Sequence, residues 1–355
     1  MSVLQANGYQ VYFQDAAYQA LNEQLAEQAY SGIYILVDEG SHEHCLPSFL
    51  AQVATEIPIE IIEFESGEQH KNLYTCLEVW QALTELGADR KSLIVNLGGG
   101  VVTDLGGFVA SAYKRGIDFI NVPTTLLAMV DASIGGKNGV DLGALKNQIG
   151  VINAPKMVLI DVAFLETLPQ NEMRSGLAEM LKHGLIYDRA YWNEFLDLGS
   201  MNWTELERLI QRSIEIKNDI VLQDPTENGI RKALNFGHTI GHAIESYFLD
   251  QPEKPNLLHG EAIAAGMIIE SFMAWRKNLI SQTELNEIKA VISDIFETLS
   301  IQPDDVSPIM DLLIHDKKNE YGQVQFALIE GIGKIIINQT AEKEEIKEAF
   351  AYYRT

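Results

Sequence analysis

The first half of this chain alternates short apolar runs with stretches of helical spacing, and this order constrains the fold more than any other feature. Three runs have the length and β-branched content of buried strands: 32–38, 57–64 and 92–97. Residues 72–86 carry apolar side chains at helical spacing and stop at Gly87, a residue type that often follows a helix. Strands alternating with helices predict a doubly wound α/β domain with a mostly parallel sheet.

The third run leads directly into a glycine-rich turn, Gly98-Gly99-Gly100, and then into a helical pattern. Glycines let the backbone approach a pyrophosphate, and the N-terminus of the following helix attracts negative charge. The spacing is not GxGxxG, and a glycine turn alone is often only a tight turn. In its strand–turn–helix context we expect it to bind a dinucleotide or a phosphate. The loop 67–71 offers polar groups for a ribose or adenine, although its composition is also typical of a solvated loop.

Polar groups gather after the next predicted strand, which starts at Phe119 and ends in Pro123 and two hydroxyl residues, Thr124 and Thr125. A glycine-rich loop region follows and contains Asp131, Lys137, Lys146 and Asn147. An ordinary surface loop would explain this composition. Lys137, which follows a Gly-Gly turn, is nevertheless well placed to meet an oxyanion.

Past Asp161 the pattern becomes almost entirely helical, and we place the domain boundary in the loop 167–170. Two domains result, 1–168 and a mainly α-helical 169–355. On the predicted helix 203–222, Lys217 shares an apolar face with Ile210 and Ile214, so it either snorkels outward or points into a cleft. The acidic segment 341–348 predicts an amphipathic helix.

Histidines are scarce, and three stretches of the helical half hold four of the 8 in the chain. In the run 234–245, a helix would place His238 and His242 one turn apart, with Glu245 on the same side. Two more clusters hold His259 with Glu261, and Glu179 with His183. Imidazoles beside carboxylates are the ligands that a Zn²⁺-like ion prefers. Two polar side chains satisfied at a domain boundary are the alternative, since HxxxH is a weaker signal than HExxH.

The net charge of −24 over 355 residues argues against nucleic acid and anionic membranes as partners. An anionic small molecule would need a locally basic pocket. Cys45 and Cys76 are the only cysteines, so no disulfide framework is expected and a reducing cytosol fits. The N-terminal residues do not resemble a signal peptide, and no apolar run approaches the about 20 residues of a membrane helix. We therefore expect a cytoplasmic protein.

Seven motifs in order across 67–334 resemble the 3-dehydroquinate synthase family. They are GGGVVTDLGG at 98–107, VPTTLLAMVDASIGGK at 122–137, LKNQIG at 145–150, SGLAEMLKHGLI at 175–186, LNFGHTIGHAIE at 234–245, LLHGE at 257–261 and DKKNEYG at 316–322. Two positions depart from the common pattern of that family. Asn138 stands where Thr is usual, and Ile152-Asn153-Ala154-Pro155 replaces a more usual Phe-x-Gln-Pro.

The resemblance implies a Rossmann-like NAD⁺-binding domain, a helical metal- and substrate-binding domain, and an active site in the cleft between them. It places the metal, zinc or cobalt, on Glu179, His238 and His259, so that His242 serves the substrate instead. A helix N-terminus at His259 would keep that imidazole neutral. The implied NAD⁺ positions are Asp38, Glu68, Lys71, Gly99, Gly100, Asp104, Thr124, Thr125, Lys137, Lys146, Phe164 and Thr167.

The implied catalytic residues are Asp131, Lys137, Lys182, Lys217, Glu227, Arg231, Asn235 and His242. The substrate-binding positions are Arg115, Lys146, Asn147 and one of Lys317 or Lys318. Arg115 is the position that reaches a neighbouring subunit in the family, which implies a homodimer.

The implied reaction converts 3-deoxy-D-arabino-heptulosonate 7-phosphate to 3-dehydroquinate and phosphate, a lyase step of the shikimate pathway that leads to chorismate and the aromatic amino acids. It combines transient oxidation by NAD⁺, phosphate elimination, reduction, ring opening and aldol closure. One alternative is a related cyclase acting on glucose 6-phosphate, such as a 2-deoxy-scyllo-inosose synthase, but Lys217 and Arg231 suit a substrate carboxylate. Others are a metal-dependent polyol dehydrogenase and a non-catalytic nucleotide-binding module.

Overall fold

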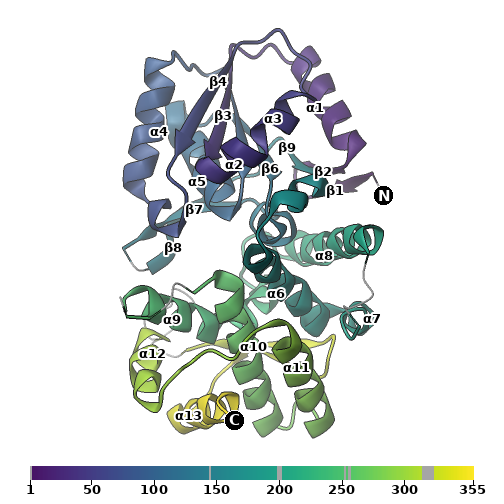
Figure 1. The fold of residues 1–355 in the computed structure, drawn as a ribbon, viewed down its shortest axis with the longest axis vertical. Coiled ribbons are helices and arrows are strands. Elements are labelled where there is room, and N and C mark those ends of the chain that lie inside the picture. Colours follow the sequence, from purple (N-terminus) through teal and green to yellow (C-terminus); the bar gives the residue numbers. More distant parts are fainter. Residues whose placement is uncertain (1, 144, 198–201, 252, 255–256, 314–323) are drawn as a thin grey trace. The chain divides into compact units, whose positions relative to one another are not determined.

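The computed structural model describes every residue except 1, 144, 198–201, 252, 255–256 and 314–323. The chain forms two compact units, Met1–Pro169 and Gln170–Thr355 (Figure 1). The first is built on a mostly parallel sheet and the second is mainly helical, so the predicted fold class is confirmed. No helix among the described residues is long and apolar enough to cross a membrane.

The first unit contains a seven-stranded sheet in the order β1-β2-β9-β6-β5-β3-β4. Its strands are β1 (Val3–Gln5), β2 (Gln10–Phe13), β3 (Ile33–Asp38), β4 (Ile59–Phe64), β5 (Leu93–Gly98), β6 (Asp118–Pro123) and β9 (Met157–Ile160). Only β1 pairs antiparallel, at one edge. The chain places β4 on one side of β3 and β5 on the other, which creates a switch point between β3 and β5 where such sheets bind ligands.

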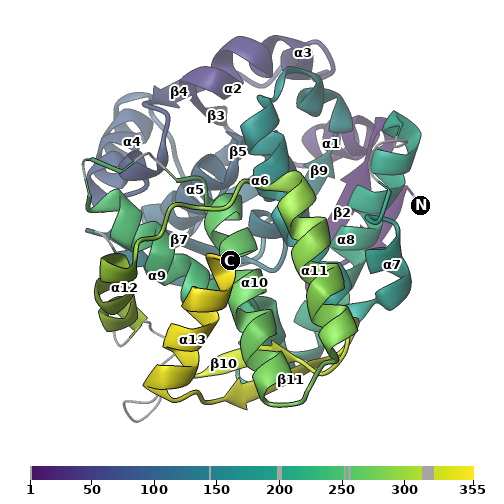
Figure 2. The same ribbon diagram turned by 60° about the horizontal axis from the view of Figure 1, so that its bottom comes forward.

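Helices cover both faces of this sheet. They are α1 (Asp15–Glu27), α2 (Glu39–His44), α3 (Leu46–Leu50), α4 (Leu73–Glu85) and α5 (Gly100–Ala112), with short turns η1 (Glu68–His70), η2 (Tyr113–Arg115), η3 (Ala128–Ala132) and η4 (Val162–Thr167). Leu36, Val79 and Leu105 belong to one buried cluster that joins β3, α4 and α5. Figures 1 and 2 show α2 and α3 on the other side of β3 and β5 from α5.

The glycine-rich region after Asp131 is a hairpin, so the expectation of a loop there was wrong. Strands β7 (Lys137–Leu142) and β8 (Leu145–Ile152) pair antiparallel. Gly139 lies opposite Gly150, and a Cβ on Gly139 would come within 2.7 Å of the Ile149 carbonyl oxygen. Glycine is depleted in strands generally, but here it lets the two backbones approach closely.

The two departures from the family pattern meet at the base of this hairpin. Asn138 donates from Nδ2 to the carbonyl oxygens of Asn153 (2.8 Å) and Gly136 (3.1 Å). Asn153 in turn donates from Nδ2 to Ser111 Oγ on α5 at 2.9 Å. Asn138 and Asn153 therefore connect the hairpin to α5. Neither departure from the family pattern removes a charged group.

The second unit is arranged around α10 (His259–Arg276), which packs against α6, α9, α11 and α13 (Figure 2). Its other helices are α6 (Gln170–Tyr187), α7 (Arg189–Asn193), α8 (Trp203–Gln223), α9 (His238–Leu249), α11 (Gln282–Ile295), α12 (Val306–Leu313) and α13 (Lys343–Tyr353), with turns η6 (Ile230–Asn235) and η7 (Pro303–Asp305). A two-stranded antiparallel sheet, β10 (Phe326–Ile329) and β11 (Ile335–Gln339), was not predicted. Apolar runs this short have no periodicity that separates strand from helix.

Glycines bring α9 and α10 into direct backbone contact. A Cβ on Gly266 of α10 would lie 2.0 Å from the carbonyl oxygen of Gly237 and 2.9 Å from the amide nitrogen of Gly241. Gly260, at the start of α10, is equally close to Ser175 of α6, and its amide donates to Ser175 Oγ at 2.9 Å. These contacts set the spacing of three helices.

Replacing Gly266 with alanine should therefore destabilise the protein. The new methyl group has no space between α9 and α10, and overpacking of this kind costs about 2 kcal/mol of unfolding free energy. Urea unfolding followed by circular dichroism measures the change. Gly40→Ala is the control, because Gly40 is exposed in α2 and its nearest contact is 3.7 Å away. A Gly266→Ala protein as stable as the parent would contradict the close contact.

Candidate functional site

Most of the residues expected to bind NAD⁺ lie at one edge of the first unit's sheet. Asp38 ends β3, Gly99 and Gly100 follow β5, and Thr124 and Thr125 follow β6. Glu68 and Lys71 come after β4, and Phe164 and Thr167 lie in η4 after β9. Parallel strands end at the same edge, so these residues share the edge where doubly wound sheets bind nucleotides.

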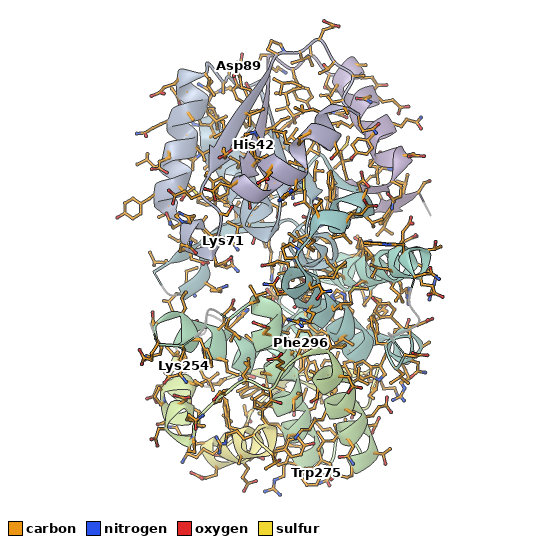
Figure 3. All side chains as sticks on the ribbon, in the orientation of Figure 1. His42, Lys71, Asp89, Lys254, Trp275 and Phe296 are labelled. Atoms are coloured by element: carbon orange, nitrogen blue, oxygen red, sulfur yellow. The ribbon has the colours of Figure 1, made fainter. Side chains whose placement is uncertain are left out.

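A buried ion pair joins the loop 67–71 to α5, the helix that follows the glycine turn. Lys71, labelled in Figure 3, is 4% exposed, and its Nζ lies 2.7 Å from Asp104 Oδ2 on α5. Burial lowers the pKa of Lys71, but Asp104, Glu68 and Asp141 outweigh it and hold the pKa above its ordinary value. Taken alone, the sequence 67–71 had looked like a solvated loop. Lys71 is instead a buried cation fixed against α5.

The hairpin β7–β8 carries the next predicted positions. Lys146 Nζ lies 3.1 Å from Glu68 Oε1, and Asn147, with a φ of 51°, donates its amide to Asp141 Oδ1 at 2.6 Å. Burial raises the pKa of Asp141 to about 6. Lys137 is exposed at the start of β7. The hairpin therefore gathers charged groups beside the expected nucleotide residues.

Two other predicted positions of this unit lie in turns next to α5. Asp131 is half-buried in η3, the turn that follows Thr125. Arg115 is exposed in the turn between α5 and β6, with a φ of 71°.

The predicted metal ligands of the second unit meet where α9 and α10 begin beside the middle of α6. Glu179 lies in α6, His238 begins α9, and His259 begins α10. Glu179 Oε1 is 3.3 Å from His238 Nε2 and 3.7 Å from His259 Nε2. Tetrahedral bonds of 2.0–2.2 Å place two ligand atoms about 3.3–3.6 Å apart. The three side chains are therefore spaced to share one divalent cation.

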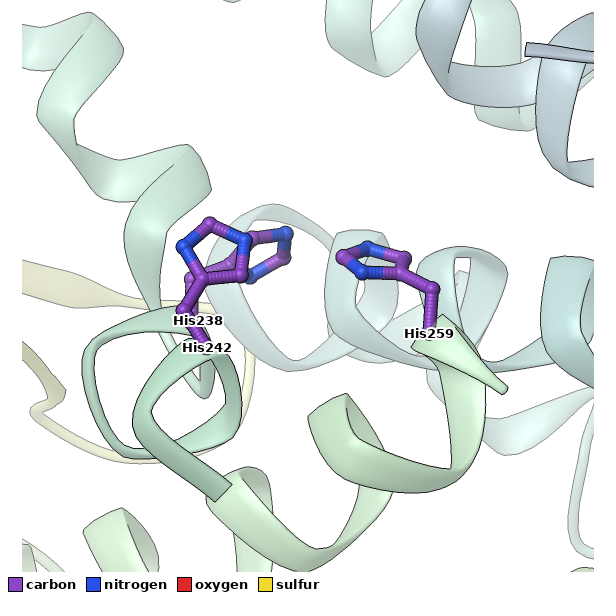
Figure 4. Close-up of side chains that lie close together, drawn as sticks. All are labelled: His238, His242 and His259. Carbon is purple, nitrogen blue, oxygen red and sulfur yellow. The ribbon is translucent and has the colours of Figure 1, made fainter. Parts of the chain in front are cut away.

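His242 lies beside the same group (Figure 4). The rings of His238, His242 and His259 have centroids 5.1–5.7 Å apart, and their ring nitrogens lie within 4.8 Å of one another. Two ligand sets are therefore compatible with the geometry: the three histidines, or Glu179 with His238 and His259 as the resemblance implies.

Glu179 is the most constrained member of the group. Its side chain is fully buried, and among the described residues neither carboxylate oxygen accepts a hydrogen bond of regular geometry. Its other oxygen forms an ion pair with Lys182, one turn further along α6. Burial raises the pKa of Glu179, but Lys182 and His238 outweigh it and hold the pKa well below its usual range. A buried anionic oxygen facing two imidazoles fits a divalent cation.

The pKa values of the two imidazoles are shifted in opposite directions. Burial and the Lys182 ammonium lower the pKa of His238 to about 4, so this ring is neutral at neutral pH. Burial also lowers the pKa of His259, but the Glu245 and Glu179 carboxylates outweigh it and raise the pKa to about 9. Without a metal ion the two carboxylates therefore outweigh the helix N-terminus at His259, and the neutral ring expected of a ligand stays a prediction for the metal-bound protein. A metal ion would displace a proton there.

His183 and Glu261, which belong to the clusters predicted from the sequence, make hydrogen bonds to groups other than the three candidate ligands. His183 is buried, and its Nδ1 lies 2.7 Å from Ser213 Oγ on α8. Glu261 accepts from the Leu258 amide at 2.8 Å, at the start of α10. By contrast, Glu245 Oε2 lies 3.3 Å from His259 Nδ1, where it can orient the ring.

The remaining predicted positions of the second unit supply buried charge and polar groups. Lys217 in α8 is only 5% exposed, which settles the question left open by its apolar face: it does not snorkel outward. Arg231 is buried and donates from Nη1 to the Pro225 carbonyl at 2.6 Å. Asn235 donates from Nδ2 to Glu227 Oε1 at 2.9 Å. Lys317 and Lys318 lie outside the described residues.

One buried acid near this group was not singled out from the sequence. Glu270 of α10 is fully buried and accepts hydrogen bonds from the backbone at the start of α9. The sequence feature that could have pointed to Glu270 is its position as a lone charge within the apolar run Ala262–Trp275.

Solved structures of similar fold define the class. A 2-deoxy-scyllo-inosose synthase crystallised with carbaglucose-6-phosphate, NAD⁺ and Co²⁺ matches with a TM-score of 0.85 and 27% identity over 99% of both chains. The 2-epi-5-epi-valiolone synthase of Streptomyces hygroscopicus, with NAD⁺ and Zn²⁺ bound, matches with a TM-score of 0.83 and 27% identity over 100% of this chain and 99% of that one. The fold is that of the sugar phosphate cyclases.

Sequence comparison narrows the class to one family. Profiles of the N-terminal and C-terminal parts of 3-dehydroquinate synthase match residues 61–175 and 176–319. The 3-dehydroquinate synthase of Parabacteroides distasonis is 40% identical over 336 residues, which is 94% of each chain. This chain belongs to the 3-dehydroquinate synthase family, and the resemblance predicted from its motifs is confirmed.

Proposed function

We propose that this chain catalyses the reaction of its family, the conversion of 3-deoxy-D-arabino-heptulosonate 7-phosphate to 3-dehydroquinate and phosphate. It is a carbon–oxygen lyase acting on phosphate, and it works in the shikimate pathway. Its 40% identity to a curated synthase over 94% of both chains supports the reaction. The single structural observation that carries the proposal is the meeting of Glu179 with His238 and His259.

NAD⁺ is the organic cofactor, and its binding residues are those that share the carboxyl edge of the sheet. When bound, it supplies a hydride acceptor. Gly99 and Gly100 leave room for the pyrophosphate at the start of α5, because a bulkier residue at 99 would meet Thr125. The Lys71–Asp104 pair holds the polar loop at 67–71 against α5.

The metal is one divalent cation, held by Glu179, His238 and His259, with Zn²⁺ favoured by this donor set. When bound, it supplies a Lewis acid for the hydroxyl groups of the substrate. His238 Nδ1 donates to the Phe236 carbonyl at 3.1 Å, which leaves Nε2 with the lone pair. In this ligand set His242 serves the substrate as an acid, base or hydrogen-bonding group.

The substrate carries a carboxylate and a phosphate, and the chain supplies cations for both. Arg231, with help from Lys217, binds the carboxylate, since a guanidinium binds carboxylates in a bidentate way. Lys137, Asn147, Lys182 and one of Lys317 or Lys318 bind the phosphate. This set of basic residues in a protein of net charge −24 favours a multiply charged anion as the substrate. Glucose 6-phosphate has no carboxylate that Arg231 could bind, so the heptulosonate phosphate is the better substrate for this set of residues.

The functional state is a homodimer in which Arg115 reaches the phosphate site of the neighbouring subunit. The exposed position of Arg115 supports this role. Light scattering tests it, because a particle mass near 39.6 kDa under assay conditions would contradict a dimer.

The reaction itself is tested by mixing protein, NAD⁺, Zn²⁺ and the heptulosonate phosphate. We expect one phosphate released per substrate consumed and no net gain in NADH absorbance, because the reduced cofactor is reoxidised within each turnover. Glu179→Gln should lose metal binding and phosphate release together. Glu172→Gln, the same change on the same helix but outside the site, should keep both.

The alternatives give different results in the same assay. Stoichiometric accumulation of NADH would identify a polyol dehydrogenase. Turnover of glucose 6-phosphate without turnover of the heptulosonate would identify the other cyclase. Nucleotide binding with no turnover would identify a binding module.

A further inference from the structure

Helix α9 begins at a position where its own sequence cannot cap it. Gly237 is the residue before the first turn and adopts a left-handed backbone with a φ of 76°. A Cβ there would lie 2.5 Å from Met267 Cγ and 3.1 Å from the Ile263 carbonyl oxygen. The first amides of a helix need acceptors from outside the helix. At α9 those acceptors have to come from another element.

Glu270 of α10 supplies them. Its Oε2 accepts from the Gly237 amide at 2.6 Å, and its Oε1 accepts from the Ile240 amide at 3.0 Å. The side chain is fully buried. Negative charge is favoured at a helix N-terminus, and both hydrogen bonds are charge-assisted, so the buried carboxylate is compensated.

The same peptide group connects Glu270 to His238. The peptide between Phe236 and Gly237 gives its N–H to Glu270, and its carbonyl oxygen lies 3.1 Å from His238 Nδ1. A carbonyl only accepts, so a ring that presents its Nε2 lone pair to an ion carries its proton on Nδ1 and donates it to this carbonyl. Nε2 is the nitrogen 3.3 Å from Glu179. Fixing the plane of this peptide therefore fixes both the tautomer and the direction of the imidazole.

We propose that Glu270 is a positioning residue for the metal site: by holding the 236–237 peptide it orients His238 for the ion. This inference rests on the metal site of the proposed function. Glu270 is not one of the candidate ligands, and the groups it is seen to hold are backbone amides. A simple helix cap would stabilise α9 without affecting metal affinity, so the two roles can be separated by experiment.

The test compares Glu270→Gln with a cap removed elsewhere in the same unit. Glutamine keeps the size of the side chain, but it places an NH₂ group against one of the two amides that Glu270 satisfies. Ser281→Ala is the matched control, because Ser281 caps α11, which carries no candidate ligand. Each purified full-length protein is titrated with Zn²⁺ against a competing chelator, and its Co²⁺-loaded form is examined by visible absorption. Thermal unfolding of the metal-free proteins gives the stability loss.

We expect Glu270→Gln to weaken Zn²⁺ binding about 10-fold or more and to alter the Co²⁺ spectrum, as loss of outer hydrogen bonds to a ligand does. Ser281→Ala should lose comparable stability and bind Zn²⁺ like the parent. Equal Zn²⁺ affinity and an unchanged Co²⁺ spectrum in Glu270→Gln would overturn the proposal and leave Glu270 as a cap.

A second measurement uses the Zn²⁺-loaded proteins, labelled with ¹⁵N at their 8 histidines. The parent should show a slowly exchanging Nδ1–H on His238, because the Phe236 carbonyl holds that proton. Glu270→Gln should exchange the proton faster, and an unchanged exchange rate would contradict the proposal. A parent protein that binds no Zn²⁺ would refute the metal site itself, whereas a parent that binds and a variant that is unaffected would refute only the role of Glu270. If Glu270→Gln does not fold, Glu270→Asp provides the same comparison.

Discussion

The second unit is built around a carboxylate that is costly to bury. Glu179 is fully removed from solvent, and desolvating an ionised carboxylate costs several kcal/mol unless positive charge or hydrogen bonds compensate it. One oxygen pairs with Lys182 and the other faces His238 and His259. Removing the cations around Glu179 would leave an uncompensated charge in the core. The helices that carry Lys182 and the two histidines must therefore stay in register with Glu179.

That register is set by small residues and backbone contacts. Gly237 and Gly266 bring α9 and α10 together, and Gly260 brings the start of α10 onto Ser175 of α6. Three helix segments far apart in the sequence thus deliver their side chains to one place. The same close packing leaves no room for a side chain at Gly237, so α9 has no cap from its own sequence. Glu270 of α10 accepts from the Gly237 and Ile240 amides instead. The buried acid at 270 is therefore a consequence of the close packing of α9 on α10.

Much of the fold could be predicted because its signals are local. The strand at 92–97 and the helix at 72–86 appear as β5 (Leu93–Gly98) and α4 (Leu73–Glu85), where Asn72 caps the helix. The β7–β8 hairpin could not be predicted, since glycine content normally marks a loop and the close approach of Gly139 to Gly150 is a pairing effect. The sequence of one segment does not show which distant segment it pairs with.

The candidate site shows the same division. Spacing within one helix brought His238 and His242 together, but only the family resemblance joined Glu179 and His259 to them. The surroundings of His259 could not be predicted from its place at a helix start, because Glu245 and Glu179 approach it only in the folded chain. Glu270 gave only the weak signal of a charge in an apolar run. Its role depends on a hydrogen bond to a backbone that lies 33 residues away in the sequence.

The most direct test of the account is diffraction from crystals of Zn²⁺-loaded protein, recorded on both sides of the zinc absorption edge. The account predicts one anomalous peak about 2.0–2.2 Å from a Glu179 oxygen and from Nε2 of His238 and of His259. A peak bonded to His238, His242 and His259 without Glu179 would contradict it, as would the absence of any peak in this group.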